Sequence, residues 1–200
     1  GPGVLPVGMG MDVRPHPHIG LSTVTYIFDG AIDHRDSLGS FATIRPGEVN
    51  WMTAGKGIVH SERSPQDERA SGAAMYGMQT WLALPDAKEE MDPAFEQVKP
   101  GQLPILSDKG VSARVIMGTL WGQTAATTCH APTIYADIML DAGGSIPIEA
   151  EADERALMLV GGQADISGEE MELYTLYVMR PGAPATLRSS AGGRVMLMGG

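Results

Sequence analysis

The chain of 200 residues carries 43% hydrophobic residues, enough for one large β domain or two of about 100 residues. Its net charge of −10, with no visible Lys/Arg cluster, argues against autonomous nucleic-acid binding, which needs a basic surface. No apolar run approaches the ~18 residues of a membrane span, and the start lacks a signal-peptide pattern, so we expect a cytoplasmic protein. The single cysteine, Cys129, excludes an internal disulfide, and we expect it to be a buried, inert thiol.

Turn residues recur at short intervals along the chain, which is the rhythm of an all-β protein. In the first half they include Asp29-Gly30, Arg45-Pro46-Gly47 and the glycine-rich stretch 54–57. A polar loop is expected at 64–72, and a solvated linker with one helical turn at 86–102. The strands predicted for this half are 20–28, 31–35, 41–44, 48–53, 58–63 and 75–84.

Two short patterns in this half have the spacing of metal ligands, His16-Pro17-His18 and His60-Ser61-Glu62. Side chains two residues apart on a strand point to the same face, so each pattern offers a pair of ligands. Strands lie about 4.8 Å apart, which lets two pairs converge on one ion at bonds of roughly 2.0–2.2 Å. A lone His-x-His also fits solvated histidines on an edge strand, but the second pair favours a metal held by His16, His18, His60 and Glu62.

The donor set restricts the metal. Neutral imidazoles with one carboxylate and no thiolate suit a borderline first-row ion rather than Ca²⁺ or Mg²⁺. Fe²⁺ is the first expectation for a catalytic site, with Mn²⁺, Ni²⁺, Cu²⁺ and Zn²⁺ as alternatives. Glu62 is the only acidic ligand, and it is therefore also the candidate general base.

The second half repeats the rhythm of the first. Arg45-Pro46-Gly47 is answered by Arg180-Pro181-Gly182, and aligning the glycine-rich stretches 54–57 and 191–193 places Met196 and Met198 opposite His60 and Glu62. Pro147 and Glu149 answer the first ligand pair. We interpret the second half as a copy without metal ligands, whose role is structural or is to shape a surface. Its predicted strands are 113–120, 133–140, 155–160, 172–179, 185–189 and 195–198.

The segment HPHIGLSTVTYIFDGAIDHRDSLGSFATIRPGEVNWMTAGKGIVHSE, followed by YGMQTWLALP, resembles the pirin family of the cupin superfamily, with similarity over nearly the whole chain. The resemblance implies a bicupin, two jelly-roll-like β-sandwich or barrel domains packed face to face. Residues 1–103 would be the metal-binding cupin with its trailing linker, and 104–200 a metal-free cupin. The family's three histidines and one glutamate map onto His16, His18, His60 and Glu62.

Two features depart from the family pattern. Residues 18–23 read His-Ile-Gly-Leu-Ser-Thr, where many pirins have His-Arg-Gly-Phe-Glu-Thr, so the rim of the pocket or its local charge is expected to differ. The chain is also short at both ends relative to the family, so terminal strands are expected to be missing from it.

The resemblance implies two functions of different classes. Some pirins have quercetin 2,3-dioxygenase activity, which implies an Fe²⁺-dependent oxygenase that cleaves a flavonol such as quercetin with dioxygen. Other pirins are cofactors of transcription factors or binders of metabolic enzymes, which implies a metal-dependent regulatory module with a protein partner. Neither function involves a membrane or direct contact with nucleic acid.

Other residues are weaker candidates for chemistry. His34, beside a hairpin, is expected at the surface. Cys129 and His130 are adjacent, and adjacent strand residues face opposite ways, so a thiolate-imidazole pair is not favoured. The tryptophans Trp51, Trp81 and Trp121 are interpreted as core anchors.

Overall fold

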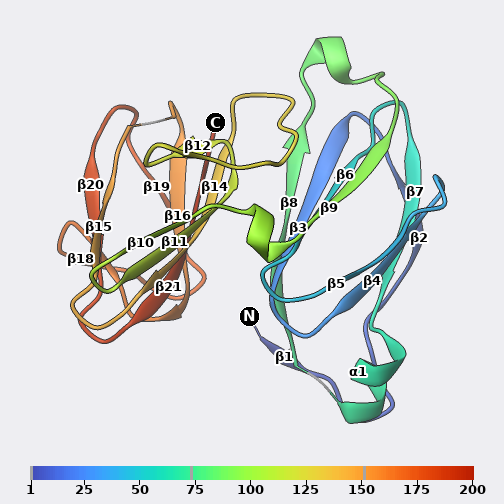
Figure 1. Ribbon diagram of the computed structural model, residues 1–200, viewed down its shortest axis with the longest axis horizontal. Coiled ribbons are helices and arrows are strands. Elements are labelled where there is room, and N and C mark those ends of the chain that lie inside the picture. The colour runs from blue at the N-terminus through green and yellow to red at the C-terminus, as the bar shows by residue number, and fades with distance from the viewer. Residues whose placement is uncertain (1, 73, 151) are drawn as a thin grey trace. The chain divides into compact units, whose positions relative to one another are not determined.

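The computed structural model describes residues 2–72, 74–150 and 152–200, in two compact units that divide between Pro100 and Gly101. The predicted division lies between residues 103 and 104. Figure 1 shows that both units are built from β-strands with short helical turns. The predicted all-β class is therefore confirmed. In the described part of the chain, no helix has the length and apolar character to cross a membrane.

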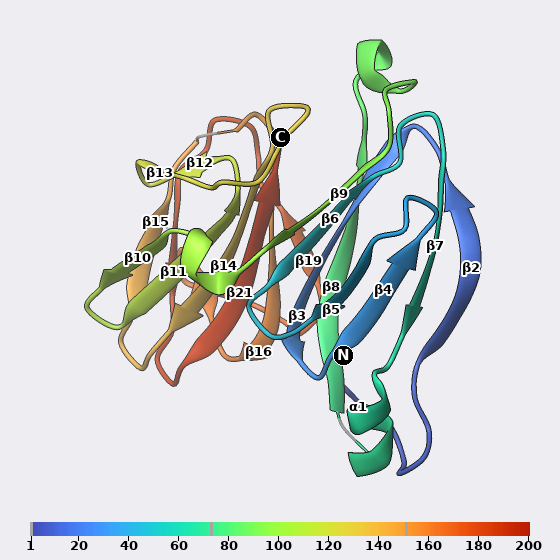
Figure 2. The same cartoon turned by 45° about the vertical axis from the view of Figure 1, so that its right-hand side comes forward.

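Two sheets form the first unit, with strand orders β1-β8-β3-β6-β9 and β2-β7-β4-β5 (Figure 2). Their inner faces meet, because Gln79 on β8 bonds Glu62 on β7 and Phe95 on β9 stacks on His34 of β4. The elements are β1 (Gly3–Val4), β2 (Asp12–His18), β3 (Leu21–Asp29), β4 (Ile32–Asp36), β5 (Phe41–Ile44), β6 (Val49–Thr53), β7 (Ile58–Arg63), α1 (Gln66–Ser71), β8 (Ala74–Ala83), the 3-10 helices Asp86–Lys88 and Pro100–Gln102, and β9 (Ala94–Val98).

The predicted strands of this unit are found with small changes at their ends. Those at 41–44 and 58–63 have the expected bounds, the strand at 48–53 starts one residue later, and the other three shift by one residue. The turns between them use glycine as expected, since Gly30 and Gly47 have φ of 84° and 80°. Glycine adopts this left-handed region without the steric cost that other residues meet. Local turn chemistry and period-two patterning therefore located these strands.

Two predictions for this unit are wrong. The expected loop at 64–72 contains α1, a helix with no buried residue, so its sequence lacks the apolar period that reveals a helix. The expected linker at 86–102 contains β9, which pairs with β6 at the edge of its sheet. Pro93 and Pro100 flank β9 instead of interrupting it, and an edge strand needs its backbone bonds on one side only.

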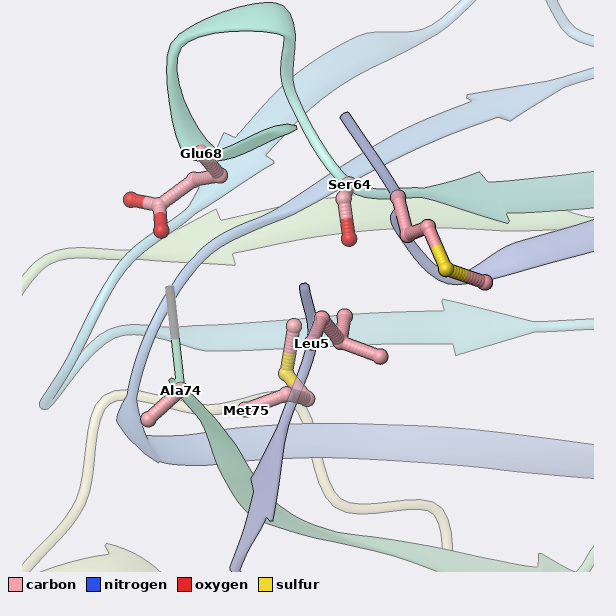
Figure 3. A pocket seen from close by; sticks show the side chains of 6 residues that line it. Leu5, Ser64, Glu68, Ala74 and Met75 are labelled. Atoms are coloured by element: carbon pink, nitrogen blue, oxygen red, sulfur yellow. The ribbon is translucent and has the colours of Figure 1, made fainter. Parts of the chain in front are cut away.

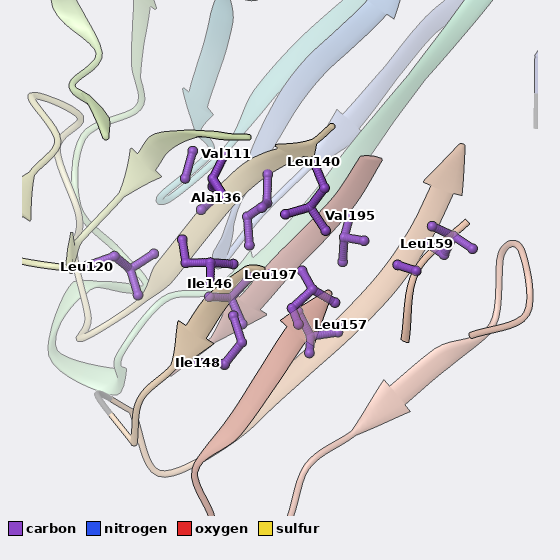
Figure 4. Packing of buried hydrophobic residues seen from close by; sticks show 14 of the residues in the cluster. Val111, Leu120, Ala136, Leu140, Ile146, Ile148, Leu157, Leu159, Val195 and Leu197 are labelled. Atoms are coloured by element: carbon purple, nitrogen blue, oxygen red, sulfur yellow. The ribbon is translucent and has the colours of Figure 1, made fainter. Parts of the chain in front are cut away.

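The second unit also has two main sheets, ordered β10-β11-β14-β21-β16-β19 and β15-β20-β17-β18, with a hairpin β12-β13. Figure 4 shows its apolar core, in which Ile146 and Ile148 of one sheet pack with Leu157 and Leu197 of the other. The strands are β10 (Ile105–Asp108), β11 (Val111–Met117), β12 (Thr119–Leu120), β13 (Gln123–Thr124), β14 (Ile134–Leu140), β15 (Ser145–Ile148), β16 (Arg155–Gly162), β17 (Asp165–Ile166), β18 (Glu169–Glu170), β19 (Leu176–Val178), β20 (Ala185–Arg188) and β21 (Gly193–Gly199).

The strand orders of the two units agree, but the predicted alignment of the repeat is wrong. The order β15-β20-β17-β18 matches β2-β7-β4-β5, and β21-β16-β19 matches β8-β3-β6. The counterpart of β7 is therefore β20, whereas Met196 and Met198 lie on β21, the counterpart of β8. The alignment slipped by one hairpin because the Arg-Pro-Gly turn precedes β6 in the first unit and β20 in the second.

The corrected alignment places apolar side chains where the first unit has histidines. On β15 and β20, Ile146 lies opposite Leu187, and both are buried. Ile148 is buried as well, whereas Pro147, expected to answer a ligand, is exposed. At the positions that correspond to the histidines, the interior of the second unit is therefore part of its hydrophobic core.

Candidate metal centre

The pairing of β2 with β7 brings the two histidine patterns together. His16 lies directly opposite His60, and His18 lies opposite Ile58, after a register shift between Val13 and His16. Residues two apart on a strand share a face, so His16, His18 and His60 point to the same side of the sheet. β4 pairs with the other edge of β7, which adds His34 and Asp36 to this face, opposite Glu62 and His60 respectively.

Three of the four predicted ligands form a tight cluster. One nitrogen from each of His16, His18 and His60 lies within 4.8 Å of the others. The Nε2 atoms of His18 and His60 are 3.1 Å apart. Two nitrogens bound to one ion at about 2.1 Å would be about 3.0–3.4 Å apart in octahedral or tetrahedral geometry. The cluster therefore fits a single ion of this size.

Glu62 lies on the same face but outside this group of three. Its carboxylate is buried, and the side-chain amide of Gln79 donates to its Oε1 at 2.9 Å. The same amide nitrogen lies 3.0 Å from Thr25 Oγ1, and the indole N–H of Trp81 donates to Gln79 Oε1 at 3.3 Å. Glu62 is thus oriented by a chain of side chains that ends at the exposed Trp81.

Burial and crowding favour the neutral imidazoles of His18 and His60. Burial, followed by the neighbouring His16, His34 and His18, lowers the pKa of His60 from 6.5 to about 3. Burial and then His16 also lower the pKa of His18. Burial raises the pKa of Glu62, although nearby histidines and the bond from Gln79 oppose the shift. Neutral imidazole is the form that binds a metal, so these shifts suit a cation site.

The prediction that His34 lies at the surface is wrong. His34 is 3% exposed, and its ring stacks on Phe95 at 4.3 Å with an interplanar angle of 12°. Its Nε2 lies 3.0 Å from Asp36 Oδ2, and its Nδ1 lies 3.4 Å from His60 Nδ1. The signal was in the sequence, because His34-Arg35-Asp36 has the same period-two spacing as the two predicted ligand pairs.

The other candidates divide between core and surface. Trp51 is buried, whereas Trp81 is 63% exposed and meets His18 edge-on at 5.0 Å, so its assignment as a core anchor is wrong. Trp121 packs against the core of the second unit. Cys129 is half-buried, which corrects the expectation of a fully buried thiol.

Two of the pockets among the described residues lie close to this interior. One, of about 210 Å³, is lined by Glu62, Gln79 and Thr25 together with the apolar side chains of Met11, Ile27, Ile32, Met75 and Met78. The other, shown in Figure 3, lies among Leu5, Ser64, Glu68 and Met75 and measures about 10 Å³, so it holds one water molecule at most. The larger pocket is the one that reaches a candidate ligand.

Comparison with known proteins places this geometry in context. Residues 3–82 match the family model described as Pirin. A pirin-like protein of Caulobacter vibrioides is 44% identical over 94% of this chain and 66% of its own length. A second pirin-like protein of the same bacterium is 32% identical over 92% of this chain and 67% of its own length. The chain therefore spans about two thirds of these relatives.

Solved structures agree with this match. Quercetin 2,3-dioxygenase from Acinetobacter baumannii superposes with a TM-score of 0.89 at 36% identity, covering 98% of this chain and 64% of that protein. The bacterial pirin YhhW from Escherichia coli, solved in complex with nickel(II), gives a TM-score of 0.76 at 21% identity over 98% of this chain and 79% of its own. At that identity the second likeness concerns the fold alone.

Proposed function

Because the chain belongs to the pirin family, we propose that it is a metal-dependent dioxygenase that cleaves a flavonol such as quercetin with dioxygen. The observation that carries the proposal is the cluster of three histidines, with ligand atoms within 4.8 Å of one another, beside the buried carboxylate of Glu62. The similar Acinetobacter baumannii protein is named a quercetin 2,3-dioxygenase, and this chain spans 64% of it.

We assign His16, His18, His60 and Glu62 as the metal ligands. The residues fit this role because burial lowers the pKa of His18 and His60, and the carboxylate of Glu62 is buried beside them, where a cation would offset its desolvation. Nitrogen donors with a single carboxylate favour Fe²⁺, Mn²⁺, Ni²⁺, Cu²⁺ or Zn²⁺, of which Fe²⁺ is our first assignment. When bound, such an ion supplies Lewis-acid chemistry and coordination positions for small ligands.

Glu62 is our candidate for the group that accepts the flavonol hydroxyl proton. Burial raises its pKa, which makes the free carboxylate a stronger base, while coordination to a cation would weaken it. Gln79 and Thr25 hold the carboxylate in a fixed direction, so a hydroxyl brought within about 2.6–3.2 Å of it would meet a positioned acceptor. Such positioned bases typically contribute roughly 10²–10⁴-fold to a rate.

The pocket of about 210 Å³ that borders Glu62 supports an apolar, partly aromatic substrate. Its walls carry the thioethers of Met11, Met75 and Met78, which are polarisable and adapt to flat rings. Its polar groups, Glu62, Gln79 and Thr25, gather on one side. A molecule with an apolar ring system and one hydroxyl directed at Glu62 matches this division.

The test is a turnover assay on the protein loaded anaerobically with Fe²⁺ and then given air and quercetin. We expect loss of the flavonol absorbance and release of carbon monoxide above the level of free iron. Glu62→Gln should lower turnover by roughly 10²–10⁴-fold at matched metal content. Glu68→Gln, on the exposed helix α1, is the matched control and should behave as wild type.

Absence of turnover in the fully metallated wild type would remove the enzyme assignment. The metal-dependent regulatory module with a protein partner would then replace it.

A further inference from the structure

A series of buried polar contacts lies behind the candidate ligand His60. His60 Nδ1 lies 3.4 Å from His34 Nδ1, and His34 Nε2 lies 3.0 Å from Asp36 Oδ2. The side chains of His34 and Asp36 are 4% and 0% exposed, so water does not replace these contacts. These contacts lead away from the three-histidine cluster, because the other nitrogen of His60, Nε2, is the one that faces His18.

Asp36, at the far end of this series of contacts, is fixed in place. Asp36 Oδ1 accepts the backbone N–H groups of Leu38 and Ser40 at 2.9 and 3.0 Å, which leaves Oδ2 for His34. The ring of His34 is held flat against Phe95. Rotation of either group would break a buried bond, which costs about 1–3 kcal/mol.

This arrangement determines which ring nitrogens of His34 and His60 carry hydrogen. A carboxylate can only accept, so His34 must donate from Nε2 to Asp36. In neutral His34 the other nitrogen, Nδ1, is then an acceptor, and His60 must donate to it from its own Nδ1. The lone pair of His60 is therefore on Nε2, the nitrogen within the three-histidine cluster.

We propose that His34 and Asp36 are positioning residues that fix His60 in the tautomer with hydrogen on Nδ1 and direct its Nε2 lone pair at the metal. The inference deepens the proposed function, since it concerns the same site. A buried carboxylate-histidine pair behind a ligand histidine also increases the basicity of that ligand, and loss of such support typically weakens metal binding by roughly 10–100-fold.

Asp36→Asn is the decisive variant. The side-chain oxygen of asparagine can still accept the N–H groups of Leu38 and Ser40, so the turn is kept. Its amide donates where the carboxylate accepted, which reverses both bonds and moves the hydrogen of His60 to Nε2. Asp33→Asn is the matched control, because Asp33 lies on the same strand but bonds Thr43 and Arg35.

The first measurement is the tautomer of His60 in metal-free, ¹⁵N-labelled protein, from long-range ¹H–¹⁵N spectra at pH 8. We expect the Nδ1–H tautomer in wild type and Asp33→Asn, and the Nε2–H tautomer in Asp36→Asn. A His60 with hydrogen on Nε2 in wild type, or an unchanged tautomer in Asp36→Asn, overturns the proposal. The wild-type spectrum decides this even if the variant does not fold.

The second measurement is Zn²⁺ affinity by competition with a chelator. Asp36→Asn should bind roughly 10–100-fold more weakly, whereas Asp33→Asn should bind as wild type. His34→Gln should retain most of the affinity, because its amide can accept from His60 and donate to Asp36. Equal affinity in wild type and Asp36→Asn overturns the proposal. A wild type that shows the expected tautomer but binds no metal would instead overturn the proposed function, and only the assignment that His34 and Asp36 fix the tautomer of His60 would stand.

Discussion

At the level of single residues, the site combines groups whose charged forms are costly. His60 is 2% exposed and Glu62 is 9% exposed, on neighbouring positions of one strand face. Burial lowers the pKa of the histidine and raises that of the carboxylate, so both groups are held toward their neutral forms without a cation. A bound cation would favour the charged carboxylate, so these pKa shifts favour binding of a positive charge at the cluster.

These shifts predict how the stability of the metal-free protein depends on pH. Between pH 6.5 and about 3, the unfolded chain protonates His60 and the folded chain does not. The free energy of unfolding therefore falls as pH drops through this window, by up to about 1.4 kcal/mol per pH unit from this residue. Glu62, whose folded pKa is raised, has the opposite sign: its contribution falls as pH rises above its ordinary value of 4.5.

Urea unfolding of wild type and His60→Gln between pH 4.5 and 8 isolates the histidine. Glu62 is present in both proteins, so its effect largely cancels in the difference. The stability of wild type relative to the variant should decrease as pH falls below 6.5. A difference that stays constant across the series would contradict the lowered pKa.

Residue patterns in the sequence predict part of this site. Period-two spacing on expected strands selects His16, His18 and His60, whose side chains the structure brings together. The direction of Glu62 could not be predicted, because it depends on Gln79, a residue 17 positions later on the opposite sheet. His34 was missed because nearness to a hairpin suggests exposure, whereas its burial comes from Phe95 on β9, a strand the sequence did not reveal.

At the level of elements, the turn between β6 and β7 sets the start of the strand that carries His60. Gly55 has φ of 51°, and its carbonyl oxygen accepts the N–H of Gly20 at 2.8 Å. The next residue, Lys56, donates its N–H to the carbonyl of Met91 at 2.9 Å. A side chain at Gly55 would collide with that same carbonyl oxygen.

Gly55→Ala should therefore destabilise the protein for two reasons, backbone conformation and collision. Gly39, with φ of 85° and nothing within 4 Å of an added Cβ, isolates the first. We expect Gly39→Ala to cost about 1–2 kcal/mol from the left-handed conformation. Gly55→Ala should cost about 1–3 kcal/mol more, as overpacking does. Urea unfolding measures the loss of unfolding free energy in each variant. Equal losses would show that the carbonyl of Met91 moves away without a free-energy cost.

At the level of the whole molecule, two units with the same strand order have different interiors. Level with the histidines of β2 and β7, the second unit has Ile146 and Leu187 in its core. The sequence predicts the duplication from its turns and rhythm, but not the strand correspondence. The repeated Arg-Pro-Gly turns lie one hairpin apart in the two units, so an alignment based on this motif pairs the wrong strands. The order of strands in the sheets identifies the correct pairs.

This difference predicts that a metal ion stabilises the two units unequally. Ligands that bind only the folded state stabilise it by RT ln(1 + [L]/Kd), about 2.7 kcal/mol at 100 times Kd. The three-histidine cluster lies on β2 and β7, so added Zn²⁺ should slow hydrogen exchange on those strands and on β4. On β15 and β20, whose inward residues are apolar, exchange should be unchanged.

Mass spectrometry of hydrogen exchange with and without Zn²⁺ makes this comparison within one molecule, and His60→Ala serves as the control for ion effects outside the site. Protection that appears equally on β7 and β20, or that persists in His60→Ala, would contradict a site confined to the first unit. Protection confined to β2, β7 and β4 follows from the register that places His16 opposite His60, because an ion shared by both strands resists their separation.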